Sequence, residues 1–228
     1  MKSENTMHIF PALSSQNIQE LIQQATYFEP YCSGFHIDIM DGDFVPATMG
    51  SATLVNELRT KTTGFIWVHL MAKNPEHYIN ELELNQNDIV SFHAEAIKPE
   101  KYAQLAHELK KKQLRPSLAL SPKTPLSVFI QAHIQEPTLF EHVLIMSVEP
   151  GKSGQLFLSS TYEKLQELQN FRLSQAQFFT IAIDGGITCS TIHKLVELGV
   201  SHAAVGSTIL HAQNPIETLK RLSNFDRE

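Results

Sequence analysis

The chain has 228 residues, of which 42% are hydrophobic, and a formal net charge of −6 with a pI near 6.0. This length and composition predict one domain over residues 1–228, with a short extension over residues 1–7. The acidic charge argues against a nucleic-acid partner. No apolar run approaches the roughly 20 residues of a membrane-spanning helix, and no signal peptide begins the chain. Two cysteines, Cys32 and Cys189, are too few for a disulfide framework and suit a reducing cytoplasm.

Short apolar segments alternate with amphipathic segments along the chain. The apolar segments, which we predict to be strands, cover residues 8–13, 35–40, 65–71, 88–95, 115–120, 142–148, 178–184 and 202–207. The amphipathic segments, which we predict to be helices, cover residues 17–28, 51–58, 75–84, 99–112, 124–132, 160–171, 189–199 and 215–223. The strand segments lack strict alternation, as is typical of strands buried on both faces. Eight strand–helix units predict a closed, parallel (β/α)8 TIM barrel, with an open doubly wound sheet as the alternative.

Polar residues gather near the C-terminal ends of these strands, which meet at the mouth of a barrel where chemistry takes place. His36 and Asp38 are two residues apart, so both side chains leave one face of their strand. Four imidazole and carboxylate donors can converge there as a metal site, unless each is only a hydrogen-bonded residue at a strand end. These donors are His36, Asp38, His69 and Asp184. His93 and Glu95 also end a strand, but we expect His93 not to be a ligand.

Glycine-rich turns follow three consecutive predicted strands. Their sequences are EPGKSGQ (149–155), DGG (184–186) and VGS (205–207). Glycine lets backbone N–H groups approach an anion closely, and the last strands of a (β/α)8 barrel commonly carry a phosphate site. One such turn would indicate only a tight loop. Three on neighbouring strands predict a bound phosphate.

Several of these segments together resemble the ribulose-phosphate 3-epimerase family, in the same order and over nearly the whole chain. They are HIDIMDGDFVPATMG, VHLMAKNPEHYI, SFHAEA, LALSPKTPL, VLIMSVEPGKSGQLF, IAIDGGI and VGSTIL. The resemblance implies a TIM barrel of the ribulose-phosphate binding type, with one divalent metal ion held by His36, Asp38, His69 and Asp184. It implies a pocket lined by Met40, Met71 and Met146, although core packing is the alternative role of any one methionine. The implied substrate and phosphate contacts are His69, Gly151, Lys152, Ser153, Gly154, Gly185, Gly186, Gly206 and Ser207.

The implied reaction is epimerisation at C3 of D-ribulose 5-phosphate to D-xylulose 5-phosphate, a step of the pentose phosphate pathway. Removal of a proton beside a ketone requires stabilisation of the enediolate, which a metal ion supplies as a Lewis acid. By resemblance, Asp38 is the base for D-ribulose 5-phosphate and Asp184 is the acid on the opposite face. The expected ion is Zn²⁺ or Fe²⁺, with Mn²⁺ or Co²⁺ as alternatives. The family also implies a homo-oligomer, a dimer or a hexamer.

The sequence departs from the family pattern at several positions. Ala12 replaces a serine that contacts substrate, and Ala47 replaces an asparagine. In the phosphate loop, Lys152 and Ser153 replace a phenylalanine and a glycine. Ser153 would be strained if its position required a positive φ. Lys152 would contact either the phosphate or the solvent.

Two further aspartates and two alternative functions remain open at this point. Asp43 stands where the family carries histidine, and we expect Asp41 to cap a turn. The departures leave the metal and acid/base residues unchanged but affect the pocket. One alternative is therefore a 3-epimerase of a six-carbon ketose phosphate such as allulose 6-phosphate. The other is a catalytically weak barrel that binds phosphate.

Overall fold

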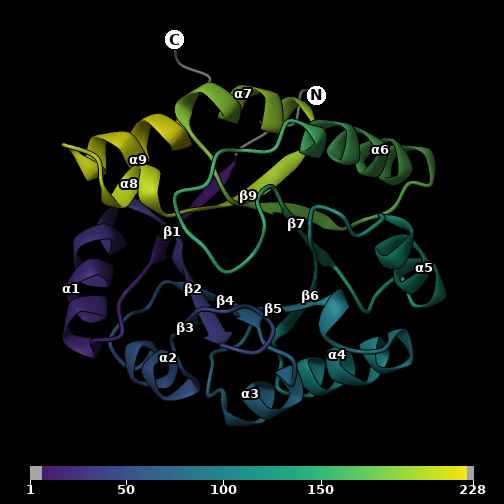
Figure 1. Ribbon diagram of the computed structural model, residues 1–228, viewed down its shortest axis with the longest axis horizontal. Coiled ribbons are helices and arrows are strands. Elements are labelled where there is room, and N and C mark those ends of the chain that lie inside the picture. The colour runs from purple at the N-terminus through teal and green to yellow at the C-terminus, as the bar shows by residue number, and fades with distance from the viewer. Residues whose placement is uncertain (1–6, 225–228) are drawn as a thin grey trace.

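The computed structural model describes residues 7–224, and its centre is a ring of parallel strands (Figure 1). Each strand of this ring pairs with the next ring strand along the chain, and the first and last ring strands pair with each other, which closes the ring. Among the described residues, eight parallel strands form this barrel, so the predicted (β/α)8 fold is confirmed. They are β1 (His8–Leu13), β2 (Gly34–Asp41), β4 (Phe65–Met71), β5 (Ile89–His93), β6 (Arg115–Leu120), β7 (His142–Met146), β8 (Thr180–Asp184) and β9 (Val200–Val205).

Helices surround the barrel, as Figure 1 shows. They are α1 (Ile18–Phe28), α2 (Ala52–Arg59), α3 (Pro75–Glu81), α4 (Tyr102–Lys111), α5 (Ser127–Gln135), α6 (Ser160–Ser174), α7 (Cys189–Glu197), α8 (Ser207–Leu210) and α9 (Pro215–Ser223). Side chains cap several of them: the Asn17 side chain accepts hydrogen bonds from the first turn of α1, and Ser51 does so for α2. Within the described part of the chain, no helix is long and apolar enough to cross a membrane.

Two layers of apolar side chains lie on the two sides of the barrel wall. The outer layer packs strand residues such as Ile37 and Ile39 against the helices. The inner layer fills the barrel with residues such as Phe10, Trp67 and Leu144. Because burial stabilises by about 25 cal/mol per Å² of apolar surface, this double layer supplies most of the driving force for folding. It also explains why the strands read as nearly continuous apolar runs.

The structure differs from the sequence-based prediction in several places, of which three concern the barrel mouth and the N-terminus. A two-residue strand, β3 (Thr48–Met49), forms an antiparallel hairpin with the end of β2, a pairing too short to leave a periodic pattern. The strand expected over residues 88–95 ends at His93, and a 3₁₀ turn (Ala94–Ala96) follows it. Of the expected N-terminal extension, residues 1–6 lie outside the described residues, whereas Met7 is only 2% exposed and belongs to the core.

Candidate active site

Four side chains converge at the C-terminal ends of β2, β4 and β8. Their ligand atoms all lie within 4.8 Å of one another; they belong to His36, Asp38, His69 and Asp184. Asp38 Oδ1 is 3.1 Å from both His36 Nε2 and His69 Nδ1. Asp184 Oδ2 is 3.8 and 3.6 Å from the same two nitrogens. The alternation along β2 sends His36 and Asp38 to the mouth and Ile37 to the helix-covered side.

The donor set and its spacing suit a metal ion. Donor atoms bound at about 2.0–2.2 Å around a tetrahedral ion lie about 3.3–3.6 Å apart. The separations of 3.1 to 3.8 Å between nitrogens and oxygens bracket this spacing. Both histidines are fully buried, while the side chains of Asp38 and Asp184 are 25% and 17% exposed. The cluster could therefore hold an ion that still faces the barrel mouth.

The charges within this cluster support one another. Burial of Asp38 opposes its ionisation, but hydrogen bonds with His36 and His69 hold its pKa well below the usual range. Burial of His69 opposes protonation, yet its hydrogen bonds with Asp184 and Asp38 raise its pKa to about 9. Because a metal ion needs the bare imidazole nitrogen, an ion that binds here displaces a proton from His69.

His93 lies directly behind His69, on the neighbouring strand β5. Its Nε2 is 2.9 Å from His69 Nε2, and its Nδ1 is 2.9 Å from Glu95 Oε2. His93 does not belong to the group of four residues that could hold an ion, and its exclusion from the ligands stays a prediction. The sequence predicted that His93 and Glu95 lie near the end of one strand, but not which groups they contact.

The three methionines occupy two different environments. Met40 and Met71 pair across β2 and β4 and pack with Val45 under the loop that follows β2. Met146 ends β7, opposite Asp184, and packs among the side chains that fill the barrel. All three are buried. Each of them lies at or next to the C-terminal end of its strand, the end that carries Asp38, His69 and Asp184.

The glycine-rich turns after β7, β8 and β9 form neighbouring loops at the same end of the barrel. Gly186 has a φ of +62°, and a Cβ there would lie 2.5 Å from the backbone nitrogen of Phe157. Gly151 has a φ of +92°, and a Cβ there would lie 2.6 Å from Val45. Only glycine fits these two close approaches. Gly154 and Gly185 also have positive φ, and Gly206 and Ser207 begin α8.

Hydrogen bonds connect these loops to each other. The Ser147 hydroxyl donates to the carbonyls of Asp184 and Gly185, which links the ends of β7 and β8. The Gln155 side chain donates to the carbonyls of Glu149 and Lys152 and so closes the loop after β7. These hydrogen bonds restrain the backbone of the loops after β7 and β8.

Ser153 and Lys152 are both exposed on the loop after β7. Ser153 is not among the residues with positive φ, so the replacement of glycine there causes no backbone strain. Ala12 pairs with His36 across β1 and β2. The Ser14 hydroxyl donates to the Met49 sulfur at 3.5 Å.

Asp41 has the structural role expected from the sequence. Its carboxylate accepts hydrogen bonds from the backbone amides of Asp43, Phe44 and Lys73. Asp43 is exposed and forms an ion pair with Lys73 at 3.8 Å. Asp41 therefore fixes the loop after β2, whereas Asp43 points to solvent.

Several residues around the site were not predicted from the sequence. Phe44 packs against His93 in a tilted arrangement, with 4.7 Å between ring centroids. Ser121 and Thr124, in the loop after β6, donate hydrogen bonds to Glu95. The polar segment SPKT that follows β6 was a signal for a functional loop, but nothing in the sequence indicated its partner.

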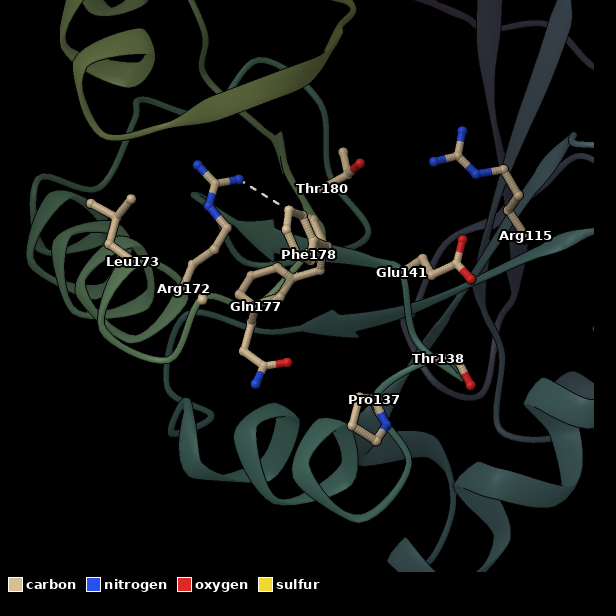
Figure 2. Close-up of a pocket in the computed structure, with 11 residues that line it drawn as sticks. Arg115, Pro137, Thr138, Glu141, Arg172, Leu173, Gln177, Phe178 and Thr180 are labelled. Carbon is tan, nitrogen blue, oxygen red and sulfur yellow. Dashed lines mark hydrogen bonds between the residues drawn. The ribbon is translucent and has the colours of Figure 1, made fainter.

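A cavity of about 740 Å³ opens at the opposite end of the barrel (Figure 2). Arg115, Glu141 and Thr180 lie there, at the N-terminal starts of β6, β7 and β8. Figure 2 shows the Arg172 guanidinium, which donates to the carbonyl of Phe179 at 3.1 Å. Because the histidine–aspartate cluster occupies the C-terminal ends of the strands, this cavity is not part of it.

Comparison with known proteins decides the family. A model of the ribulose-phosphate 3-epimerase family matches residues 8–210. The chain belongs to the ribulose-phosphate 3-epimerase family. The cytoplasmic isoform of ribulose-phosphate 3-epimerase from Oryza sativa is 35% identical over 188 residues, which are 82% of this chain and 79% of that protein. The ribulose-phosphate 3-epimerase of Schizosaccharomyces pombe is 30% identical over 220 residues, covering 95% and 92% of the two chains.

A solved structure supports the fold independently of the sequence. The crystal structure of 3-hexulose-6-phosphate synthase aligns with a TM-score of 0.67 over 95% of this chain and 98% of that chain. At 13% identity this likeness concerns the barrel fold alone. As a member of the ribulose-phosphate 3-epimerase family, the chain is an enzyme of the epimerase class, in a family that acts on sugar phosphates.

Proposed function

We propose that the chain catalyses metal-assisted epimerisation at C3 of D-ribulose 5-phosphate to D-xylulose 5-phosphate, a step of the pentose phosphate pathway. The convergence of two imidazoles and two carboxylates at the barrel mouth carries this proposal. The names of the relatives from rice and fission yeast point to the same reaction.

The metal ligands in this proposal are His36 through Nε2, His69 through Nδ1, and one oxygen each of Asp38 and Asp184. A divalent ion bound there supplies Lewis acidity that stabilises the negative charge developing on the substrate oxygens. A nitrogen and oxygen donor set without thiolate favours Zn²⁺ or Fe²⁺ and also accommodates Mn²⁺ or Co²⁺.

Asp38 and Asp184 transfer the protons. Asp38 lies on β2 and Asp184 on β8, and β1 and β9 separate these strands in the barrel, so the two carboxylates can reach opposite faces of a planar enediolate. Asp38, whose low pKa keeps it ionised, removes the C3 proton of D-ribulose 5-phosphate. Asp184 then donates a proton to the other face, and the roles exchange in the reverse direction.

Backbone amides bind the phosphate in this proposal. They belong to residues 151–154, 185–186 and 206–207, and His69 also faces the substrate. Exposed Lys152 adds a positive charge beside them. Met40, Met71 and Met146 form a polarisable, apolar floor that keeps water from the enediolate.

A second substrate class follows from one position in the pocket. Ala12, the penultimate residue of β1, lies beside His36 and offers no hydroxyl to the sugar, so one contact that would help to select the five-carbon substrate is missing. A six-carbon ketose 6-phosphate would use the same metal and the same two aspartates.

An assay of metal-reconstituted enzyme tests the function. Enzyme that has been stripped of metal and reloaded with Zn²⁺ or Fe²⁺ should interconvert ribulose and xylulose 5-phosphates, and we expect a higher kcat/KM for them than for a six-carbon ketose 6-phosphate. A higher value for the six-carbon substrate would reverse the assignment. No turnover of either substrate with any of the four metals would leave only a phosphate-binding barrel.

The metal site has its own test. Purified protein should contain about one divalent ion per chain, and His69→Ala should release it while the barrel stays folded. Equal metal contents in the two proteins would refute the ligand assignment.

We also infer a cytoplasmic homo-oligomer, a dimer or a hexamer. Light scattering measures its mass directly.

A further inference from the structure

Two residues that have no role in the proposed reaction form hydrogen bonds that lead from His69, a candidate metal ligand, into the protein. His69 directs Nδ1 toward Asp38 and Asp184, and its Nε2 faces away from them toward His93 Nε2 at 2.9 Å. His93 is completely buried, and its other nitrogen is 2.9 Å from Glu95 Oε2. Three side chains thus form one continuous line of hydrogen bonds that ends at the proposed metal.

The chemistry of the three groups determines where each proton lies. An ionised carboxylate can only accept, so His93 carries its hydrogen on Nδ1 and donates it to Glu95. The Nε2 of neutral His93 is then bare and accepts a hydrogen bond, which His69 donates from its own Nε2. Once a metal ion displaces the proton that His69 Nδ1 shares with Asp38 and Asp184, this nitrogen offers its lone pair on the side of the two aspartates.

We propose that Glu95 and His93 are positioning residues that hold His69 in the tautomer and orientation that bind a divalent metal ion through Nδ1. This inference rests on the proposed function, because it assumes that the four-residue cluster binds metal. A ligand histidine whose other nitrogen donates to a fixed acceptor is oriented and made more basic by it. For His69 this acceptor is a second histidine, His93. The negative charge is on the Glu95 carboxylate, which is the next group along the line.

The loop after β6 holds Glu95 in place. The Ser121 amide donates to Glu95 Oε1 at 2.8 Å, and the Thr124 hydroxyl donates to the same oxygen. The ammonium group of Lys164, on α6, donates to the carbonyls of Ser121, Pro122 and Thr124 at 2.7 to 3.1 Å. These contacts leave Oε2 for His93. The carboxylate is therefore not free to turn away from the line.

The other histidine of the cluster lacks such support. His36 Nδ1 is buried without a hydrogen-bond partner among the described residues. The orientation of His36 thus depends on packing, including an edge contact with Trp67 at 4.6 Å between ring centroids. His69 is the ligand that a hydrogen-bonded line orients, so metal affinity should depend on Glu95 and His93.

Zinc affinity measured by competition with a chromophoric chelator tests the proposal. Glu95→Gln removes the charge, and His93→Phe keeps a ring against Phe44 but removes the acceptor for His69. We expect each to weaken zinc binding about 10- to 100-fold. His93→Gln offers a carboxamide oxygen to His69 and should restore part of the affinity.

Matched controls separate positioning from stability. His133 is also buried and hydrogen-bonded, but it lies on α5, away from the mouth. Glu141 pairs with Lys110 at the start of β7. His133→Gln and Glu141→Gln should keep the wild-type zinc affinity whatever they do to the thermal midpoint. Loss of affinity in the controls equal to that in the two test variants would mean that general destabilisation is the cause, and would overturn the proposal.

Nitrogen-15 NMR of the zinc-loaded enzyme gives a second readout. We expect the hydrogen of His69 on Nε2 and that of His93 on Nδ1; a hydrogen on His93 Nε2 would overturn the proposal. If His69→Ala abolishes zinc binding while Glu95→Gln and His93→Phe bind as tightly as wild type, only this inference fails. If the wild type binds no zinc, the proposed metal site fails and this inference fails with it.

Discussion

Asp184 is the carboxylate whose position most directly determines the proposed stereochemistry. It ends β8, and its side chain is 17% exposed and faces both imidazoles of the cluster. Asp38 faces the same imidazoles from β2, and hydrogen bonds with them outweigh the cost of burial and keep its pKa low. In the proposed reaction, these two carboxylates from separate strands serve as a base and an acid on either side of one pocket.

The exchange of Asp184 for asparagine tests this division of roles. Asp184→Asn keeps an oxygen near the metal but removes the proton donor, so we expect kcat to fall at least about 100-fold. With metal still bound, Asp38 should continue to exchange the C3 proton of ribulose 5-phosphate with D2O while little xylulose 5-phosphate forms. NMR of the recovered substrate measures this exchange.

Wild-type conversion in D2O provides the control for that experiment. The product should carry deuterium at C3, because the proton removed on one face is not the proton returned on the other. Product without deuterium would point to a single shielded base and would withdraw the assignment of the two aspartates.

At the scale of elements, the loops after β7, β8 and β9 provide neighbouring rows of backbone amides. The close approaches at Gly151 and Gly186 require glycine, and the Ser147 and Gln155 side chains fix the loops further. Such preorganised amides recognise an anion at little entropic cost. In the proposed function, these loops select a phosphorylated sugar and the strand ends carry the chemistry.

Removal of the phosphate group should weaken binding strongly. Two lost charge-assisted hydrogen bonds, at about 1.5 kcal/mol each, correspond to roughly 100-fold, so free ribulose should have a kcat/KM lower by at least about that factor. Lys152→Ala should raise KM for the phosphorylated substrate by about three- to tenfold, less at high salt. Lys123→Ala, which alters an exposed lysine paired with Glu149, is the matched control. Equal kinetics with free ribulose and its phosphate would contradict the phosphate site.

Strand β9 carries a partly buried histidine, His202, that stacks on Phe10. Burial, together with nearby His8 and Arg115, lowers the pKa of His202 from 6.5 to about 3. Between these values the unfolded chain takes up a proton that the folded chain does not. The free energy of unfolding should therefore fall as pH drops below about 6.5, by up to about 1.4 kcal/mol per pH unit from this group.

His202→Phe tests this pH dependence, because phenylalanine keeps the stacking on Phe10 but does not titrate. Urea unfolding at pH about 7 and about 5 should show a smaller loss of stability in this variant than in the wild type. His77→Gln changes an exposed histidine on α3 and should leave the pH dependence as it is. If the free energy of unfolding changes with pH by the same amount in the wild type and in His202→Phe, this pH dependence does not come from His202.

At the scale of the whole molecule, closure of the barrel makes each strand depend on both of its neighbours. The pairing of β1 with β2 and β9 joins the first and last strands of the barrel, and one apolar layer runs around its outside. We therefore expect the chain to unfold as a single unit.

Metal should shift that transition. An ion that binds only the folded chain stabilises it by about 2.7 kcal/mol at 100 times its Kd. The thermal midpoint measured by calorimetry should accordingly rise with added Zn²⁺ and fall with a chelator. His69→Ala should abolish this response. If the thermal midpoint of the wild type does not change with added metal, the proposed metal site is wrong.

Much of the architecture could be predicted from the sequence, because each strand–helix unit carries its own local signal. Apolar runs such as residues 65–71 coincide with observed strands, since strands buried on both faces must be apolar throughout. The hairpin strand β3 could not be predicted, because two residues carry no period. The end of β5 at His93 was missed because alternating polar residues continue through Glu95 into the 3₁₀ turn.

The sequence by itself determined the barrel, the family and the four donors at the strand ends, because residue type, strand period and chain order are local properties. Only the tertiary structure decided which atoms meet. It placed His69 Nδ1 toward the aspartates and Nε2 toward His93, Met146 apart from Met40 and Met71, and Ser153 at a φ that suits any residue. These outcomes depend on side-chain rotamers and on distances between strands far apart in sequence, which are set when the barrel closes and its interior packs.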